Sequence, residues 1–493
     1  MIARRVIVLL ASTLALGGLA APAALAQQPE TSGAAFAASM EQVISRAIAT
    51  AEKSVVAIAR VPKERPGETV GLEFRPDPFS RRTSPFNPPK PTDADFVPKD
   101  FATGVVVDRQ GLILTAYHAL GEDSDYYVTT SDRRIYRAAV KGADPRSDLA
   151  VLAIEATDLT PIQLGDAARL KKGQIVIALG NPYAIARDGQ VSASWGIVSN
   201  LTRKAPLTPD ESDSTGKSTL HHFGTLIQTD AKLNLGTSGG ALVNLKGEMV
   251  GLTTSLAASA GYEQAAGYAF PVDATFRRVL ETLKQGREVE YGLLGVRPTN
   301  LTAHELLQGL RGCRVQGIVR GTPAQRFGLQ EGDLVTTVNG IPVYEADGLV
   351  LEVGRLPVES TVRLGVVRNG KKVDVDVTLT KYPVRGTKVV TNRDPNWRGI
   401  RVDYASAAID AEAQATLGLP EFDEGVVVTE VEQGSPAWHA GLRPKNLITQ
   451  VDHTPVRNPR EFLTAVAGKT GSVQVRLTEG VEENAVRTIG PGT

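Results

Sequence analysis

Three side chains that could together perform acyl transfer are spread over the first half of the chain. His118 and Asp148 each stand at the end of a strand-like apolar run, and Ser238 lies in the glycine-rich turn Gly236–Gly240. A serine hydroxyl becomes a nucleophile when a base removes its proton, and an imidazole with a pKa near neutrality can take that proton and return it to the leaving group. A carboxylate can fix the imidazole tautomer and stabilise its cation. The residue types therefore predict a nucleophile in Ser238, a general base in His118 and an orienting group in Asp148.

The turn around the serine is built to bring backbone N–H groups close to a ligand, because glycine has no Cβ. We expect Gly236, Thr237 and Ser238 to form an oxyanion hole, in which amides face the charge that develops in the transition state; removing one such donor typically costs about 3 kcal/mol. The residues that follow, 241–252, contain two apolar runs separated by Lys246-Gly247-Glu248. This pattern predicts a β-hairpin that holds the turn.

Each of the three residues has an ordinary explanation when taken alone. A histidine after a strand is commonly a surface or core residue, and an aspartate before a strand is commonly a turn former. Together, in the order His, Asp, Ser, they follow the arrangement of chymotrypsin, which favours catalysis. The other histidines show no ligand-like spacing with Cys, Asp or Glu, so no metal site is predicted. They are His221, His222, His304, His439 and His453.

The composition is that of a folded protein with several domains. At 493 residues the chain is too long for one core and predicts about three domains. Lys+Arg and Asp+Glu both number 54, so no charge excess favours nucleic acid or an anionic surface as a partner. No nucleotide-binding motif is present, and no cofactor is expected.

The N-terminus has the pattern of an export signal. Arg4-Arg5 precede an apolar run, and Ala24-Leu25-Ala26 has the small residues of a cleavage site, so residues 1–26 are predicted to be a signal peptide. The alternative is a membrane anchor, but the run is short and no basic cluster follows it. A chain with a single cysteine, Cys313, cannot form an internal disulfide, and export without disulfides indicates the periplasm or the outer face of a bacterial cell.

The elements that must position the three residues are mainly strands. Residues 27–60 predict a helical segment leading into a strand, and the Pro-rich stretch 61–100 predicts a long loop or insertion. Residues 101–284 read as many short, evenly spaced strands, which is typical of β-barrels. The expected strands include 103–107, 112–115, 126–130, 149–154, 175–179 and 191–198.

The last part of the chain contains an internal repeat. Gly321–Val343 and Gly434–Val456 align without gaps, with Pro, Gly-Leu and Pro-Val at matching positions. Self-similarity of this kind predicts two copies of one module. The copies are expected at 291–382 and 397–490, joined by a linker over 383–396.

Several further blocks make the chain resemble the HtrA (Deg) family of exported serine proteases. Thr103–Val107 with Leu112–His118 looks like the family's histidine motif, and Ser147–Leu152 is similar to its aspartate motif. Ala178–Tyr183 and Gln228–Ala231 resemble other family blocks. The resemblance implies a mainly β protein, with a chymotrypsin-like double β-barrel followed by two PDZ domains of the α+β class.

The chain departs from the family pattern near the serine. Thr237 stands where the family usually has Asn, Ala241 where it has Pro, and Lys232 where it prefers a small residue. Lys232 either points to solvent or reaches the floor of a specificity pocket, where it would favour an acidic residue before the cut. We hypothesise a pocket for small or medium apolar residues. Its expected lining is Lys232, Leu233, Leu235, Leu252, Thr253, Thr254 and Ser255.

The two PDZ-like modules differ in the loop that binds a peptide carboxylate in this domain type. Such domains add a peptide strand to a sheet edge and hold its C-terminus in a nest of amides. The first copy has Leu293, Leu294, Gly295 and Val296, with apolar residues beside the glycine. The second has Arg398 at an expected apolar position. We therefore expect the first copy to bind C-terminal peptides and the second to have a mainly structural or assembly role.

The resemblance implies an ATP-independent serine endopeptidase that cleaves unfolded or misfolded exported proteins. It also implies a periplasmic homotrimer or higher homo-oligomer, with no nucleic acid partner and no membrane span after signal cleavage. One alternative is a non-proteolytic chaperone or PDZ scaffold, and the complete triad is evidence against it. Another alternative is an esterase. The esterase would require a strand-turn-helix nucleophile elbow, which this sequence lacks.

Overall fold

The computed structural model describes residues 33–63, 98, 100–181, 189–205, 217–254, 266–393, 396–408, 425–478 and 486–492. The expected signal peptide and nearly all of the Pro-rich stretch lie outside these ranges, as does Ser255. The chain from Ile44 onward forms one compact unit, and the residues before it form a second. Helix α1 covers Gly33–Ala51.

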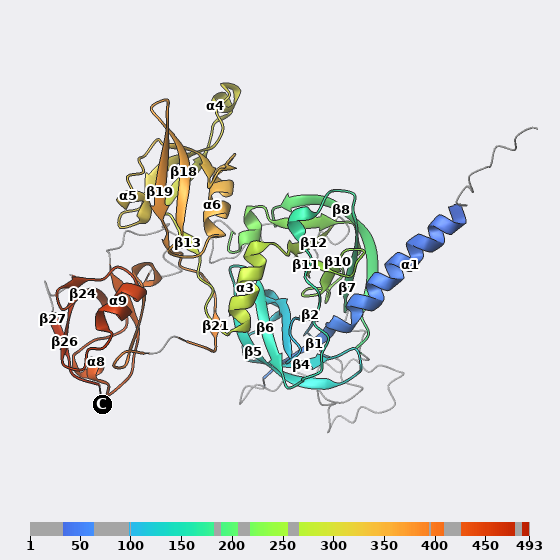
Figure 1. The fold of residues 1–493 in the computed structure, drawn as a ribbon, viewed down its shortest axis with the longest axis horizontal. Coiled ribbons are helices and arrows are strands. Elements are labelled where there is room, and N and C mark those ends of the chain that lie inside the picture. The colour runs from blue at the N-terminus through green and yellow to red at the C-terminus, as the bar shows by residue number, and fades with distance from the viewer. Residues whose placement is uncertain are drawn as a thin grey trace, which may run out of the picture. The chain divides into compact units, whose positions relative to one another are not determined.

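The first barrel is built from strands that precede and follow the histidine and aspartate motifs (Figure 1). Its strands pair in the order β5-β4-β1-β2-β3-β6, and an additional β5–β6 pairing closes the barrel. The core consists of alternating apolar side chains such as Val56, Val106 and Ile113. The strands are β1 Val55–Pro62, β2 Asp100–Val106, β3 Leu112–Ala116, β4 Ser124–Thr129, β5 Ile135–Asp144 and β6 Leu149–Ile154.

The second barrel contains the serine loop, which joins β9 to β10. Its strands close in the order β10-β11-β12-β9-β8-β7, and its buried side chains include Leu179, Leu226 and Phe270. The hairpin predicted after Ser238 corresponds to β10 paired with β11. The strands are β7 Ile175–Gly180, β8 Ser192–Arg203, β9 Leu226–Thr229, β10 Ala241–Val243, β11 Met249–Thr254 and β12 Gly267–Pro271. Helix α3, Ala274–Lys284, follows the barrel.

Each repeated module contains a sheet in which five strands pair in sequence, and the first of them is an edge strand. In the first module the path is β14-β15-β16-β18-β19, and in the second it is β22-β23-β24-β26-β27. The first module comprises β13 Gly292–Leu293, β14 Val296–Asn300, α4 Ala303–Leu307, β15 Cys313–Ile318, α5 Pro323–Arg326, β16 Leu334–Val338, β17 Ile341–Pro342, α6 Ala346–Gly354, β18 Thr361–Arg368, β19 Lys371–Thr378 and β20 Thr380–Lys381. The second comprises β22 Ile400–Tyr404, β23 Val426–Val431, α8 Pro436–His439, β24 Leu447–Val451, β25 Thr454–Pro455, α9 Pro459–Val466, β26 Val473–Leu477 and β27 Val486–Ile489. The predicted fold class, a double β-barrel followed by two α+β modules, is confirmed.

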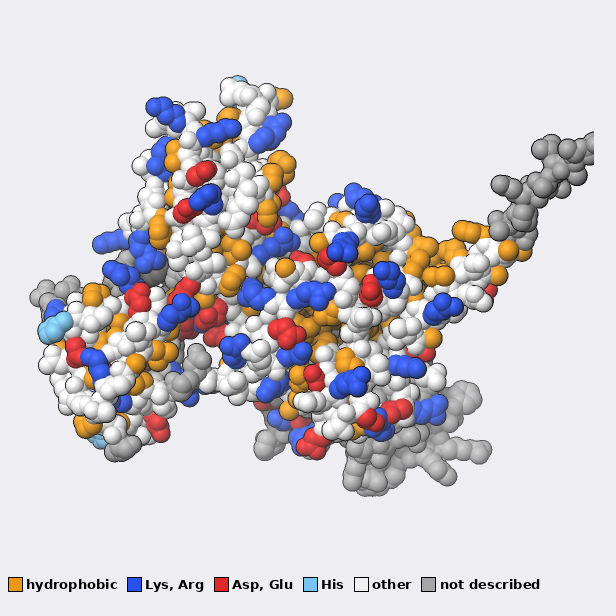
Figure 2. Space-filling view, in the orientation of Figure 1, with side chains coloured by type: hydrophobic (Ala, Val, Ile, Leu, Met, Phe, Trp, Pro, Cys, Tyr) orange, Lys and Arg blue, Asp and Glu red, His pale blue; other side chains and the backbone are white. Residues whose placement is uncertain are grey.

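The segment between the two modules and the single cysteine are both held in sheets. The segment expected to be a linker contains a strand, β21 Val389–Val390, which pairs with β5 of the first barrel. Cys313 is fully buried in β15, and burial raises the pKa of its thiol to about 12. Figure 2 shows Lys and Arg side chains interspersed with Asp and Glu on the face in view, as expected from the equal charge counts.

Candidate active site

His118 lies in a single 3₁₀ turn, η2 Tyr117–Ala119, directly after β3. The strand ends at Ala116, whose side chain is fully buried, and the His118 side chain in the following turn is partly exposed. Asp148 lies just before β6, the neighbour of β3 in the sheet, and its carbonyl oxygen accepts a hydrogen bond from Tyr117 N at 2.9 Å. Strand pairing therefore brings residues thirty positions apart in the sequence into contact.

The Asp148 carboxylate holds His118 at two points. Oδ1 accepts the His118 backbone N–H at 2.9 Å, and Oδ2 lies 2.7 Å from Nδ1 of the ring. A carboxylate can only accept, so Nδ1 carries the proton and Nε2 presents a lone pair. Asp148 is buried, and its φ of +55° lies in the left-handed region, which non-glycine residues seldom occupy.

Ser238 meets the imidazole from the second barrel. Its Oγ lies 2.9 Å from Nε2 of His118, on the side of the ring opposite Asp148. The serine carbonyl accepts a hydrogen bond from Thr103 N of β2, at 2.9 Å, which ties the serine loop to the first barrel. The structure thus brings the three predicted side chains into one hydrogen-bonded row.

The surroundings favour a protonated imidazole during reaction. Burial disfavours the His118 cation, but the charge of Asp148 and its hydrogen bond outweigh burial, so the pKa of His118 is raised above its ordinary value of about 6.5. The His118 ring is therefore a stronger base than free imidazole. This suits a group that takes a proton from serine and returns it to a leaving group.

The turn before the serine has a defined geometry. Thr237 N donates to Asn234 O at 3.2 Å, and Gly236 has φ +90°, so residues 234–237 form a type II turn. A Cβ at Gly236 would lie 2.4 Å from the Phe101 ring and 2.6 Å from the Asn181 carbonyl. The glycine is therefore required by both conformation and space.

Hydrogen bonds fix this turn on both sides. Thr103 Oγ1 donates to Gly236 O at 2.7 Å, and Thr253 Oγ1 donates to Thr237 O at 2.5 Å. Thr237 uses its own hydroxyl to donate to Asn234 O at 2.6 Å. The backbone carbonyls of Asn234, Gly236 and Thr237 therefore all accept hydrogen bonds from within the protein and point into it.

The remaining residues of the expected pocket occupy different environments. Lys232 and Leu235 are exposed, while Leu233 is partly buried against the second barrel. Leu252 belongs to the buried core, and Thr253 and Thr254 are buried in β11. Ser194 Oγ donates to the Lys232 carbonyl at 2.8 Å, which fixes the backbone there.

A second layer of polar residues behind Asp148 was not foreseen from the sequence. Asp144 is buried, and its Oδ2 accepts hydrogen bonds from Ser147 N at 2.9 Å, from Ser147 Oγ at 2.5 Å and from the Tyr291 hydroxyl. His221 lies 2.9 Å from the Ser147 carbonyl through Nε2. Burial lowers the pKa of His221 to about 4, so this ring is a neutral donor. No sequence signal identifies such partners, because they lie 74 and 147 positions from the residues they contact.

The loop expected to bind a peptide carboxylate in the first module and the corresponding loop of the second module differ in structure as well as in sequence. In the first, the carbonyls of Leu294 and Gly295 accept hydrogen bonds from Ala324 N and Val319 N, both at 2.9 Å. Both carbonyls therefore point into the module. Gly295 has φ +87°, and a Cβ there would lie 2.1 Å from Thr322 Cβ.

In the second module the corresponding loop is closed by its own contacts. Ile400 N donates to Trp397 O at 3.0 Å, which uses one amide of the loop. The Arg398 guanidinium donates to the carbonyls of Lys469 at 2.7 Å, Ile489 at 3.1 Å and Gly490 at 2.6 Å. Arg398 thus fastens the loop to the chain beyond α9 and to the end of β27.

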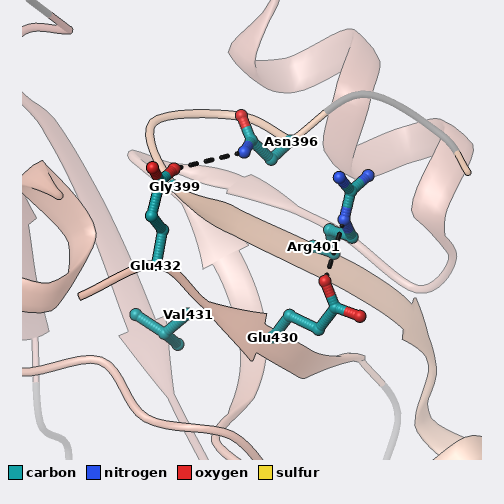
Figure 3. Close-up of a pocket in the computed structure, with 6 residues that line it drawn as sticks. All are labelled: Asn396, Gly399, Arg401, Glu430, Val431 and Glu432. Carbon is teal, nitrogen blue, oxygen red and sulfur yellow. Dashed lines mark hydrogen bonds and ion pairs between the residues drawn. The ribbon is translucent and has the colours of Figure 1, made fainter.

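A pocket in the second module is lined by residues at and near the start of β22 and at and after the end of β23, which are Asn396, Gly399, Arg401, Glu430, Val431 and Glu432 (Figure 3). Its walls are charged, and Arg401 Nε donates to Glu430 Oε2 at 3.0 Å across it. None of the predicted catalytic residues lines it. Within the described ranges, no group of three His, Cys, Asp or Glu side chains is arranged to hold a metal ion. No helix among those residues is long and apolar enough to cross a membrane.

Comparison with known protein families matches three parts of the chain. Residues 102–252 match a trypsin-like peptidase domain, and residues 292–379 and 427–478 each match a PDZ domain. The two PDZ matches fall in the repeated modules.

Individual relatives show the same organisation. The chain is 30% identical over 458 residues to a probable periplasmic serine endoprotease DegP-like of Chlamydia trachomatis, covering 88% of this chain and 86% of that protein. It is 30% identical over 385 residues to the periplasmic serine endoprotease DegP of Escherichia coli K12, covering 77% and 74%. Among solved structures, the HtrA-type protease AlgW with a tripeptide superposes with a TM-score of 0.51 at 26% identity, covering 69% of this chain and 97% of that one. The chain belongs to the HtrA/DegP family and is a serine endopeptidase with a trypsin-like domain and two PDZ domains.

Proposed function

We propose that this protease acts in the bacterial periplasm, without ATP, on unfolded or misfolded exported proteins, and that peptide binding to its first PDZ domain regulates it. Ser238 is the nucleophile, His118 the general base and Asp148 the group that orients the base. The amides of Gly236 and Ser238, with Thr237 between them, form the oxyanion hole. The functional form is a homotrimer or a larger homo-oligomer.

The observation that carries the proposal is the hydrogen-bonded row of Asp148, His118 and Ser238, with contacts of 2.7 and 2.9 Å. In this row Nε2 of His118 accepts the serine proton as the hydroxyl attacks a carbonyl carbon. The resulting imidazolium is stabilised by the adjacent carboxylate and then protonates the leaving amine. The negative charge that develops on the former carbonyl oxygen is stabilised by hydrogen bonds from the amides of Gly236 and Ser238.

The test is digestion of a permanently unfolded protein by the mature chain, beginning at Gln27, with the folded form of the same protein as a control. Cleavage of the unfolded form alone, accelerated by a C-terminal peptide and absent from the Ser238→Ala chain, is the expected result. A chain that suppresses aggregation of the substrate but never cleaves it would instead be a chaperone or scaffold.

The ends of the fragments from this digest report the specificity pocket. We propose that Leu233 and Leu235, with β11 behind them, accept a small or medium apolar residue before the cut, because Lys232 is exposed. We expect Ala, Val, Leu and similar residues to dominate at that position in fragments sequenced by mass spectrometry. Predominance of Asp and Glu would place the Lys232 ammonium group in the pocket and contradict this proposal.

The difference between the PDZ loops predicts that only the first one binds peptide strongly. Leu294→Arg, which copies the second loop, is expected to weaken binding of a fluorescent C-terminal peptide about tenfold or more, or ~1.4 kcal/mol. The matched change, Arg398→Leu, is expected to leave the affinity unchanged. Both are measured by fluorescence anisotropy in the full chain carrying Ser238→Ala, so that the peptide is not cut. Equal losses from the two changes would mean that both loops bind.

A further inference from the structure

The segment between the two PDZ domains, residues 382–392, runs along the first barrel of the protease. We refer to it as the inter-PDZ segment. Its strand β21 extends the sheet beyond β5, with Val389 opposite Ala143 and Val390 opposite Gly142 (Figure 1). These two partners immediately precede Asp144, where the turn that leads to Asp148 begins. The strand is therefore added next to the catalytic machinery.

Both ends of the inter-PDZ segment are fastened by hydrogen bonds to the residues around α3 and β5. At its beginning, Tyr382 N donates to Tyr291 O at 2.7 Å. At its end, Thr391 N and Asn392 N both donate to Gly286 O, at 3.0 and 2.9 Å. Thr391 Oγ1 also donates to Lys141 O of β5 at 2.7 Å. A free linker would not use its backbone in this way.

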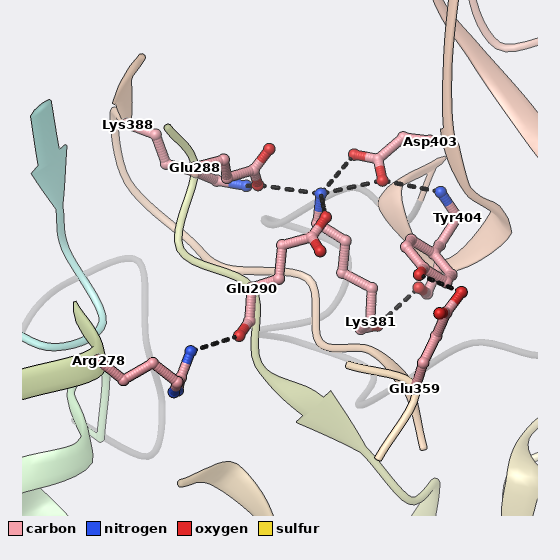
Figure 4. A network of polar contacts seen from close by, with 9 residues as sticks. Arg278, Glu288, Glu290, Glu359, Lys381, Lys388, Asp403 and Tyr404 are labelled. Atoms are coloured by element: carbon pink, nitrogen blue, oxygen red, sulfur yellow. Dashed lines mark hydrogen bonds and ion pairs between the residues drawn. The ribbon is translucent and has the colours of Figure 1, made fainter. Parts of the chain in front are cut away.

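A buried ion cluster holds the chain where the inter-PDZ segment begins (Figure 4). Lys381 is 3% exposed, and its Nζ lies 2.7 Å from Asp403, 3.0 Å from Glu288 and 3.1 Å from Glu290. Lys388, within the segment, lies 2.6 Å from the same Glu288. A buried charge is retained only with such partners, so the cluster fixes the path of the chain.

The inter-PDZ segment contacts the Asp144–Asp148 turn directly. A Cβ at Gly386 would lie 3.0 Å from Pro145 Cβ, so the inter-PDZ segment and the Asp144–Asp148 turn are in close contact. The Arg146 guanidinium lies 3.6 Å from the centre of the Tyr382 ring, a cation–π contact. The segment also supports Tyr291, whose hydroxyl donates to Asp144.

The inter-PDZ segment also contacts the histidine turn. The Tyr117 hydroxyl donates to the Thr387 carbonyl at 3.1 Å. Tyr117 precedes His118, and its own amide donates to the Asp148 carbonyl. The Tyr117 side chain therefore connects the inter-PDZ segment to the turn that contains His118. The Tyr117 backbone amide extends this connection to Asp148.

The turn requires such support because Asp148 has φ +55°. A non-glycine residue in the left-handed region persists only where its surroundings over-determine the conformation. We infer that the inter-PDZ segment is a positioning element of the protease, which holds the Asp144–Asp148 turn and so places Asp148 against His118. The inference rests on the catalytic roles proposed above.

The experiment compares two glycine substitutions in the full chain. Gly386→Val pushes the inter-PDZ segment away from Pro145, whereas Gly370→Val, in the β18–β19 hairpin, introduces the same side chain at φ +77° with no atom within 4 Å of its Cβ. We measure kcat and KM on a short chromogenic peptide, together with the dependence of kcat/KM on pH. Gly386→Val is expected to lower kcat about 10- to 100-fold at unchanged KM. Gly370→Val is expected to match the wild type.

The pH profile separates positioning from loss of folded protein. A displaced Asp148 lowers the pKa of His118, so the acid limb of kcat/KM moves to lower pH, whereas partial unfolding reduces the rate without moving it. Tyr117→Phe removes only the hydroxyl bonded to Thr387 and is expected to lower kcat about threefold to tenfold with the same direction of shift. A wild-type kcat together with a wild-type pH profile in both Gly386→Val and Tyr117→Phe would overturn the inference. A wild-type chain without any cleavage would instead overturn the proposed function.

Discussion

Ser238→Ala is expected to lower kcat about 10⁶-fold while KM changes little. The hydroxyl is the only group removed, and the backbone hydrogen bond from Thr103 N to the Ser238 carbonyl does not depend on it. The fold and the substrate site should therefore survive. The measurement is turnover of a short chromogenic peptide, with thermal unfolding of both chains followed by circular dichroism as the control for folding.

The sharper form of this expectation is non-additivity. If Nε2 of His118 activates Ser238 across their 2.9 Å contact, the base has no function once the hydroxyl is gone. His118→Ala should then reduce kcat about as much as Ser238→Ala, and the double variant should fall no further. Additive losses in the double variant would show that the two side chains act independently and would contradict a shared proton transfer.

The sequence allowed the three residues and the fold class to be predicted because their signals are local. Each of the three residues proposed to be catalytic lies beside a short apolar run, and Gly236 and Gly239 mark backbone positions with positive φ. The pairing of β3 with β6 then brings His118 into contact with Asp148. The repeat of Pro, Gly-Leu and Pro-Val at equal spacing was likewise readable without a structure.

The supporting contacts could not be predicted because they join residues that are far apart in the sequence and individually ordinary. Asp144 reads as a turn aspartate, and only the fold brings Tyr291 to its carboxylate. The residues Val389–Val390 are too short a run to predict a strand, and their pairing with β5 depends on the path of the chain after the first PDZ domain. Arg398 departs visibly from the apolar residue expected at its position, but its three carbonyl partners depend on the fold.

Asp148→Asn is expected to lower kcat about 10⁴-fold with little change in structure. In the wild type, Oδ1 accepts a hydrogen bond from the backbone N–H of His118 at 2.9 Å, and the amide oxygen of Asn can take over this bond. The NH₂ group of Asn then occupies the position of Oδ2 and faces Nδ1 of the ring. An NH₂ group donates, so Nδ1 must accept and the ring proton moves to Nε2. The nitrogen facing Ser238 then has no lone pair for the serine proton, and the base is lost.

The pH dependence distinguishes this mechanism from simple loss of a contact. The negative charge of Asp148 raises the pKa of His118, so its removal lowers that pKa, and the acid limb of the residual kcat/KM shifts to lower pH. Asp132→Asn, which alters a half-exposed carboxylate in the same barrel, serves as the control and should retain wild-type kcat and the wild-type acid limb. If Asp148→Asn kept its activity within tenfold of the wild type, the carboxylate would not be fixing the tautomer. The left-handed turn at Asp148 would then be a feature of the fold alone.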